Sequence, residues 1–458
     1  MYKLLMSIIV LFISQISNSQ ENFTSTYPDS LKENAQAILR ENRIEIDLIS
    51  INKMNIKKKR IITIFNELGL KHVDAFEYYD KATSIKNIEA TIYNSAGIEL
   101  KKIKRKDFKD HSVTESSIIT DNRVLYLEYT PIQYPITIVF ESEINTSNTA
   151  FIPSWYGVEN FNLGIQKSSI NIKYSPEIQF KYKEINLSDS VEKIISGNSI
   201  NFSIQNVKPL KQEELSPSKL SFFPHVMFGL NKFNLEGIIG TTEDWGSFGS
   251  WIYEYLLKDT EEIPLETVQK LKTLIGEEKD FLKIAKTVYE FVQNKTRYVS
   301  VQLGIGGWKP MLAKDVDRLG YGDCKALTNY TRVLLKAFDV PSYYTIVYGD
   351  KTKRDLIEDF VAMQGNHVIL GIPYNNEITW LECTSQIQPF GFQGDFTDDR
   401  KVLIINSEKS EIVKTTAYNG TDNNQKTNAN VELLINGDLI LDFKMVSKGT
   451  IYDNKFQL

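Results

Sequence analysis

The spacing of hydrophobic residues changes once along this 458-residue chain, and the two spacings require two different kinds of fold. From about residue 43 to 207, apolar and polar residues alternate, as in "ITIVFESEI" at 136–144 and "SINFSIQNV" at 199–207. Alternation is the period of a strand with one buried face. Many such segments separated by polar turns predict an N-terminal antiparallel β-sandwich over residues 20–235.

The later part of the chain has helical spacing. In "KDFLKIAKTVYEFVQNKT" at 279–296, apolar residues recur every three or four positions and form one stripe, which indicates a helix packed on a core. Short strands return in "SYYTIVYG" at 342–349 and "NHVILGIP" at 366–373. Helices and strands in separate runs predict an α+β domain over residues 240–412.

The last segments are polar and then strand-like. Residues 413–430 are interpreted as a linker. Residues 431–458 alternate around Asn436-Gly437, a pair that favours a two-residue hairpin turn. Because an isolated hairpin is only marginally stable in water, we interpret residues 431–458 as the start of a C-terminal β domain.

Residues 1–19 have the features of a secretory signal peptide. A lysine precedes an apolar run at 4–13, and the small residues Ser17 and Ser19 precede an expected cleavage at Gln20. No cysteine stands at the cleavage point to carry a lipid anchor. No apolar run approaches the ~18 residues of a transmembrane helix. We therefore expect a protein without a transmembrane segment that is exported to the periplasm or cell surface.

The charge balance argues against nucleic acid as a partner. The chain has 53 basic and 58 acidic residues, and its basic run "KKKR" at 57–60 is typical of a solvated strand end. In the β part, His72 and His111 are isolated and are interpreted as surface or turn residues. No function is assigned to the β part, and the oligomeric state is left open.

The segment "DRLGYGDCKALTNYTRVLLKAFDVP" combines a helix start with a candidate nucleophile. Apolar positions from Ala326 onward share one helix face, Asp323 is a suitable N-cap, and Cys324 follows at the first helical position. The positive end of the helix dipole favours a thiolate at that position. The carboxylate of Asp323 opposes it, since a nearby negative charge disfavours a second one. Gly320 and Gly322 leave room for a substrate backbone.

A nucleophilic thiolate needs a base, and the base needs a group that orients it. If Asn375-Asn376 form a two-residue hairpin turn, His367 lies opposite Thr384 and Glu382 is its diagonal neighbour on the same face. Cys383 then points to the opposite face. A change of one residue in the turn would reverse this parity. The register would give the thiolate a base in His367 and an orienting carboxylate in Glu382.

Three segments, "GYGDCKALTNYTRVLLKAFDVP", "NHVIL" and "WLECTS", resemble the signature blocks of the transglutaminase-like superfamily in the same order. The resemblance covers about residues 245–410, and the β part resembles an uncharacterised domain that precedes such cores in exported bacterial proteins. It implies a papain-like fold, in which a helix carrying the cysteine packs on an antiparallel sheet carrying the histidine and the acid. Cys324 would be the nucleophile and His367 the base. Glu382 would stand where the family usually has Asp.

The resemblance also implies a class of reaction. The superfamily includes transglutaminases, peptidases and amidases, and active members form a thioester intermediate. We therefore expect an acyl-transfer enzyme that needs no cofactor or metal and acts on a protein, peptide or cell-envelope substrate. The alternative is a catalytically inactive module that binds peptide or glycan in the cell envelope.

Two structural alternatives for the cysteines remain open at this point. Cys324 and Cys383 could form a disulfide, because an exported protein can hold one. Together with His367 they could also bind zinc, although no ligand pair has the usual short spacing. If the site is an enzyme, an oxyanion needs a donor. The candidates are the backbone N–H of Cys324 and the side chain of Gln302.

Overall fold

The computed structural model of this chain describes residues 27–114, 118–453 and 455. The predicted signal peptide lies outside the described residues. Within those residues, no helix has both the length and the apolar character needed to cross a membrane.

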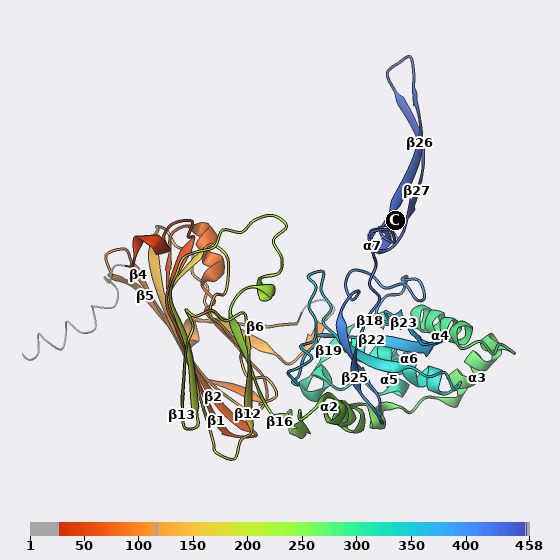
Figure 1. The fold of residues 1–458 in the computed structure, drawn as a ribbon, viewed down its shortest axis with the longest axis horizontal. Coiled ribbons are helices and arrows are strands. Elements are labelled where there is room, and N and C mark those ends of the chain that lie inside the picture. The colour runs from red at the N-terminus through yellow and green to blue at the C-terminus, as the bar shows by residue number, and fades with distance from the viewer. Residues whose placement is uncertain (1–26, 115–117, 454, 456–458) are drawn as a thin grey trace, which may run out of the picture. The chain divides into compact units, whose positions relative to one another are not determined.

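The chain forms two compact units. Unit 1 contains the chain up to residue 113 and residues 121–239. Unit 2 contains residues 114–120 and the chain from residue 240 onward. The division after residue 239 separates a region of strands from the region that contains the α-helices (Figure 1).

Unit 1 is built on one sheet of eight strands. Its strands are β1 (Ala37–Ser50), β2 (Lys53–Ile64), β4 (Thr83–Asn94), β5 (Glu99–Lys104), β9 (Ile136–Thr146), β11 (Leu163–Tyr174), β13 (Glu192–Ser196) and β14 (Ser199–Val207). Their order across the sheet is β13-β14-β11-β1-β2-β9-β4-β5.

One strand pair of this sheet departs from the predicted antiparallel arrangement. β1 and β11 run parallel, with Ala37 opposite Leu163 and Ile46 opposite Ile172, whereas the other neighbouring strands are antiparallel. Residues 51–162 connect β1 to β11, and a parallel pair needs such a long connection because a tight hairpin joins antiparallel strands only. The prediction of a purely antiparallel sheet was therefore wrong at this pair.

Two three-stranded sheets accompany the large sheet and supply aromatic partners for its inner face. The centroid of Phe202 on the large sheet lies 6.2 Å from that of Phe228, and Phe140 lies 6.3 Å from Phe108. The inner face is thus apolar while the outer face carries polar side chains. The remaining strands of this region are β3 (Phe76–Tyr79), β6 (Lys109–Ser112), β8 (Arg123–Tyr126), β10 (Trp155–Tyr156), β12 (Phe180–Ile185), β15 (His225–Leu230), β16 (Lys232–Leu235) and β17 (Ile238–Thr241).

His72 lies in a turn, as one of the two expected positions has it, but it is buried and not at the surface. It ends the short 3₁₀ turn η2 (Glu67–His72), yet it is only 2% exposed and neither ring nitrogen has a hydrogen-bond partner among the described residues. Arg60 holds this turn, because its Nη2 donates to the carbonyl of His72 at 3.0 Å. The same guanidinium is paired with Glu159 at 2.8 Å. The sequence carries no pattern that distinguishes this buried histidine from an exposed one.

Acid should therefore loosen this turn. Burial first, and then the positive charges of Lys71 and Arg60, lower the pKa of His72 from 6.5 to about 4. The unfolded chain binds a proton between those pH values and the folded chain does not, so stability is complete above pH 6.5 and decreases towards pH 4. The expected loss is about 3 kcal/mol. Hydrogen exchange in η2, corrected for intrinsic rates, should show this loss in the wild type and not in His72→Leu.

The exposed His111 provides the control for that measurement. His111→Leu should keep the wild-type pH dependence, since this residue is exposed on β6. Equal pH dependence in His72→Leu and the wild type would contradict the assignment of the acid sensitivity to His72.

Unit 2 combines helices with a five-stranded antiparallel sheet (Figure 1). The helices are α2 (Trp245–Ile252), α3 (Leu265–Ile275), α4 (Phe281–Lys295), α5 (Ala313–Leu319), α6 (Cys324–Lys336) and α7 (Thr450–Asp453). The strands of the main sheet are β21 (Tyr343–Val347), β22 (His367–Tyr374), β23 (Glu377–Leu381), β24 (Lys401–Ile405) and β25 (Glu411–Lys414). Their order is β23-β22-β21-β24-β25.

Two short parallel pairs lie beside this core. β18 (Arg297–Tyr298) pairs with β20 (Tyr321–Gly322), the strand that leads directly into α6. β19 (Ser300–Gln302) pairs with β7 (Ile118–Thr120), which belongs to unit 2 although its sequence lies within the β part.

Helix α6 is the central helix of unit 2. It packs on β22 and against α4 and α5, and every residue from Cys324 to Leu335 is buried. Sequence spacing predicted one buried face, but the polar residues of α6 are buried as well because each finds a partner. Thr328 donates to the carbonyl of Val368 at 3.2 Å, and Arg332 is paired with Glu261 at 2.6 Å. In α4, the predicted stripe is buried except for Phe281, which is 41% exposed.

Before α7, the chain forms a hairpin of β26 (Gln425–Leu433) and β27 (Leu439–Ser447). β25 and the first six residues of β26 occupy part of the predicted linker, so residues 413–430 are not linker throughout. One face of the hairpin is apolar, with Val431 opposite Leu441 and Leu433 opposite Leu439. These side chains are exposed, at 61% for Val431 and 52% for Leu441.

Candidate active site

Cys324 is the first residue of α6, as the sequence predicts. Asp323 is the N-cap, and its Oδ1 accepts a hydrogen bond from the backbone N–H of Ala326 at 2.9 Å. Gly320 and Gly322, which precede Asp323 in the sequence, also have local structural roles. Gly320 ends α5 with φ +69°, and a Cβ on Gly322 would lie 2.8 Å from the Cβ of Ala326. The cysteine is 9% exposed, so its sulfur lies at the edge of the core.

Both residues that flank Cys324 are charged and buried. Lys325 forms an ion pair with Oδ2 of Asp323, and their side chains are 9% and 3% exposed. The negative charge that the sequence places beside the cysteine therefore has a cationic partner.

The hairpin of β22 and β23 has the register that the sequence favours. Leu370 faces Leu381 and Tyr374 faces Glu377, with Asn375 and Asn376 as a two-residue turn. Both turn residues have positive φ, 50° and 64°, as a type I′ turn requires.

This register brings His367 and Glu382 together. Glu382 follows the end of β23, and its Oε2 lies 2.8 Å from Nε2 of His367. The second carboxylate oxygen accepts hydrogen bonds from the backbone N–H of Thr384 at 3.1 Å and from its hydroxyl at 2.6 Å. The side chains of His367 and Glu382 are 10% and 11% exposed. Both carboxylate oxygens are thus held, and the other ring nitrogen of His367 is left for the sulfur.

The charges in the site stabilise one another. Burial alone would lower the pKa of His367, but the Glu382 carboxylate and a hydrogen bond with the Cys324 sulfur outweigh it and raise the pKa to about 10. Burial would likewise raise the pKa of Glu382, but His367 and the Thr384 hydrogen bonds lower it. The imidazole is therefore stabilised as a cation between a carboxylate and a sulfur.

Cys383 lies on the other face of the hairpin and is part of the apolar core. Both cysteines are free, which rules out the disulfide alternative. Among the described residues, no group of histidine, cysteine and acidic side chains could hold a metal ion, so the zinc alternative has no ligand set there. Burial raises the pKa of the Cys383 thiol to about 12, despite hydrogen bonds with Thr331 and Thr328.

The two thiols should consequently react at very different rates. At pH 7, iodoacetamide should modify Cys324 about 100-fold faster than Cys383, because almost no thiolate forms on a buried thiol with a pKa of about 12. Intact mass and peptide mapping, with and without reductant, measure both rates. Equal rates, or the absence of a free thiol before reduction, would contradict this assignment.

Other side chains hold the pair of His367 and Glu382 in place, and no motif in the sequence distinguishes them. The hydroxyl of Tyr289, on the α4 stripe, donates to the carbonyl of Glu382 at 2.9 Å and fixes its backbone. The ring of Phe396 meets the imidazole of His367 edge-on at 5.3 Å. A Cβ on Gly349 would lie 2.4 Å from the ring of Phe396, so any side chain at this position would require that ring to move.

Gln302, the candidate oxyanion donor, has a different partner. The side-chain amide of Gln302 donates a hydrogen bond to the hydroxyl of Ser300 at 3.2 Å. The backbone carbonyl of Gln302 accepts a hydrogen bond from the hydroxyl of Thr120 at 3.2 Å. The backbone N–H of Cys324, in the open first turn of α6, is the donor that the helix start provides.

A hollow of about 460 Å³ lies on the Glu382 side of the histidine–carboxylate pair, and neither His367 nor Cys324 lines it. Its walls include Glu382, Thr384 and Phe396, and it also contains the carboxyl groups of Asp395 and Asp453. A substrate that reaches the pair from this side would therefore meet a polar surface.

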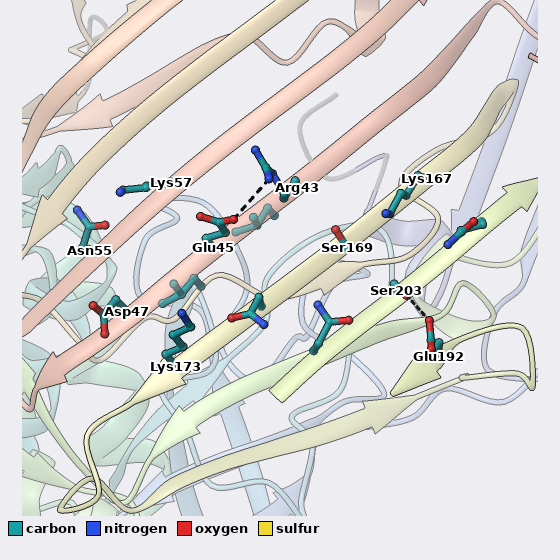
Figure 2. A pocket seen from close by; sticks show the side chains of 15 residues that line it. Arg43, Glu45, Asp47, Asn55, Lys57, Lys167, Ser169, Lys173, Glu192 and Ser203 are labelled. Carbon is teal, nitrogen blue, oxygen red and sulfur yellow. Dashed lines mark hydrogen bonds and ion pairs between the residues drawn. The ribbon is translucent and has the colours of Figure 1, made fainter. Parts of the chain in front are cut away.

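A second hollow, of about 620 Å³, lies on the outer face of the large sheet in unit 1 (Figure 2). It is lined by charged, amide and hydroxyl side chains, with ion pairing between Arg43 and Glu45 and a hydrogen bond from Ser203 to Glu192. Its lining contains no cysteine or histidine.

Comparison with known proteins agrees with this division of the chain. Residues 52–211 match a family described as a Domain of Unknown Function with solved-structure structure, DUF3857, as the resemblance of the β part to an uncharacterised domain implied. No curated protein matches the sequence.

Among solved structures, one described as a "putative protease" from Parabacteroides distasonis ATCC 8503 aligns with a TM-score of 0.60 and 12% identity. The alignment covers 84% of this chain and 72% of that chain, so the two share a fold. A "putative cysteine protease" from Cytophaga hutchinsonii aligns over 86% of this chain and 91% of its own at 8% identity, with a TM-score of 0.21. An M1 zinc metallopeptidase from Deinococcus radiodurans aligns over 42% of each chain at 5% identity, with a TM-score of 0.20. At these last two scores, neither alignment bears on the fold.

Proposed function

We propose that unit 2 is a thiol-dependent acyl-transfer enzyme of the transglutaminase-like type with a papain-like core. Cys324 is the nucleophile, His367 the acid and base, and Glu382 the residue that orients His367. The observation that carries this proposal is the buried pair of His367 and Glu382, whose Nε2 and Oε2 atoms lie 2.8 Å apart, together with Cys324 at the start of α6, whose sulfur also stabilises the imidazolium. A nucleophile, a base and an orienting group in contact are the arrangement that nucleophilic catalysis requires.

In the first half of the reaction, the thiolate of Cys324 attacks the carbonyl carbon of an amide, and a C–S bond forms. The carbonyl oxygen becomes an oxyanion, which the backbone N–H of Cys324 is placed to bind. The imidazolium of His367 gives its proton to the leaving nitrogen, the C–N bond breaks, and an amine departs. The enzyme is left as a thioester with a neutral imidazole.

In the second half, His367 removes a proton from water or from a second amine, which attacks the thioester carbon. The C–S bond breaks, and the thiolate and imidazolium are restored. Attack by water gives hydrolysis, and attack by an amine gives a new amide. We place the substrate among proteins, peptides and cell-envelope polymers, in keeping with the signal-peptide features of residues 1–19.

An activated ester tests the proposal without knowledge of the natural substrate. With p-nitrophenyl acetate, the protein should release nitrophenolate in a burst and gain one acetyl group on Cys324. The acetyl group should disappear in water and should be transferred when a primary amine is added. Absence of an acetyl adduct on Cys324 would overturn the proposal and would favour an inactive, ligand-binding module.

A further inference from the structure

Asp323 and Lys325, on either side of Cys324, form a buried ion pair, and neither takes part in the bond-making steps of the proposed reaction. Counted over backbone and side chain together, Asp323 is 2% exposed and Lys325 is 7% exposed. Lysine and aspartate are rarely buried to this extent unless they are paired, since an isolated buried charge is costly. The ammonium of Lys325 and Oδ2 of Asp323 are in direct contact.

Asp323 is required for the helix start itself. Its Oδ1 caps α6 through the backbone N–H of Ala326 at 2.9 Å, and its carbonyl accepts from the backbone N–H of Leu327 at 2.9 Å. The helix dipole favours anions at this end, and the cap satisfies a free N–H group. An N-cap carboxylate therefore holds Cys324 at the first helical position, but it also brings a negative charge next to the sulfur.

That negative charge opposes the formation of a thiolate. At an effective dielectric constant of about 20, a unit charge on a neighbouring residue displaces the pKa of a thiol by about one to two units. An ammonium in contact with the carboxylate cancels most of this effect, because the sulfur then faces a dipole instead of a net charge.

We infer that Lys325 is a positioning residue for the reaction: it neutralises Asp323, so that an anionic N-cap can hold Cys324 without suppressing its thiolate. This inference rests on the proposed function, in which Cys324 reacts as a thiolate. It assigns a role to the order of charges in "GDCK", where the acid precedes the cysteine and the lysine follows it.

The other titratable groups near the sulfur come from four separate segments. His367 on β22 is hydrogen-bonded to it and Glu382 lies behind His367. Tyr298 on β18 and Tyr344 on β21 both interact electrostatically with Cys324 and Asp323, and burial raises the pKa of each phenol, so both are neutral near pH 7. Apart from the histidine–carboxylate pair, the charged residues next to Cys324 in the described chain are therefore its two neighbours in sequence, Asp323 and Lys325.

The test is the pH dependence of Cys324 alkylation by iodoacetamide in the full-length chain. Lys325→Met leaves the carboxylate uncompensated and should raise the midpoint by about one to two pH units. Asp323→Asn keeps a competent N-cap, because asparagine caps helices as well as aspartate does, and should lower the midpoint. The double variant Asp323→Asn/Lys325→Met should return close to the wild-type midpoint.

The pattern of the three variants separates the possible outcomes. If the pair has only a structural role, Lys325→Met and the double variant should both lose melting temperature and reactivity, and the pH midpoint of Cys324 alkylation should not change. That result would overturn the inference. If Lys325→Met does not fold, an unchanged midpoint in Asp323→Asn overturns it equally well. A wild-type midpoint near 8.5, the value of an ordinary thiol, would instead contradict the proposed function.

Discussion

Cys324→Ala should abolish acyl transfer, with a loss of about 10⁴-fold or more in turnover, because no thioester can form without the sulfur. With p-nitrophenyl acetate, the variant should show neither a burst of nitrophenolate nor an acetyl adduct. Its fold should be retained, since alanine fits the first turn of α6 and the N-cap hydrogen bond from Ala326 to Asp323 does not involve the thiol.

The second cysteine of the chain provides a matched control. Cys383→Ala removes a thiol that is 3% exposed and packed in the core of unit 2, so it should cost about 1 kcal/mol of stability and leave turnover within a few-fold of wild type. Turnover close to wild type in Cys324→Ala as well as in Cys383→Ala would show that the reaction does not pass through either sulfur.

The parts of the site that the sequence predicts are those set by local geometry. Residues of a strand alternate between two faces, and Asn375-Asn376 adopt the positive φ values of a two-residue turn. These two facts are enough to put His367 and Glu382 on one face and Cys383 on the other. The start of α6 is equally local, because an N-cap acts within one turn.

The features that were mispredicted depend on residues far apart in the sequence. α6 is buried on all sides because Arg332 meets Glu261 and Asn329 meets Thr260, and no spacing within α6 encodes those partners. For the same reason the alternation of β1 and β11 predicts two strands but not that they run parallel. The ion pair of Asp323 and Lys325 was also missed, because a lysine in a first turn is usually exposed.

Glu382 stands where the transglutaminase-like superfamily, which the sequence resembles, usually has Asp, and the structure shows how the longer side chain is held. Glu382 lies one residue beyond the end of β23, and Tyr289 holds its carbonyl at 2.9 Å. From that position the carboxylate reaches Nε2 of His367 at 2.8 Å. Glu382→Asp should therefore be too short at the same backbone position, and its turnover should fall between those of the wild type and Glu382→Gln.

Glu382→Gln should lower turnover by about 10² or more while substrate binding changes little, and Thr384 is the reason. Its N–H and hydroxyl both donate to Oε1 of Glu382, at 3.1 and 2.6 Å, so in the variant that position must remain an oxygen. The new NH₂ group then faces Nε2 of His367 and makes that nitrogen an acceptor. The ring proton moves to the nitrogen that faces the sulfur, and a neutral imidazole in this tautomer cannot accept a proton from the thiol. The corresponding exchange in a serine triad costs about 10⁴.

Three measurements on Glu382→Gln separate this effect from simple loss of structure. Turnover of p-nitrophenyl acetate should fall, the Cys324 alkylation midpoint should rise because His367 loses the carboxylate that stabilises its cation, and the melting temperature should change little. Thr384→Val provides the companion variant, since it removes the hydroxyl donor at 2.6 Å and keeps the backbone N–H. Combined with Glu382→Gln it should recover part of the activity, because the amide is then less constrained to present its NH₂ group to His367. If turnover and alkylation in Glu382→Gln both match the wild type, then Glu382 does not orient His367, and the proposed triad is reduced to Cys324 and His367.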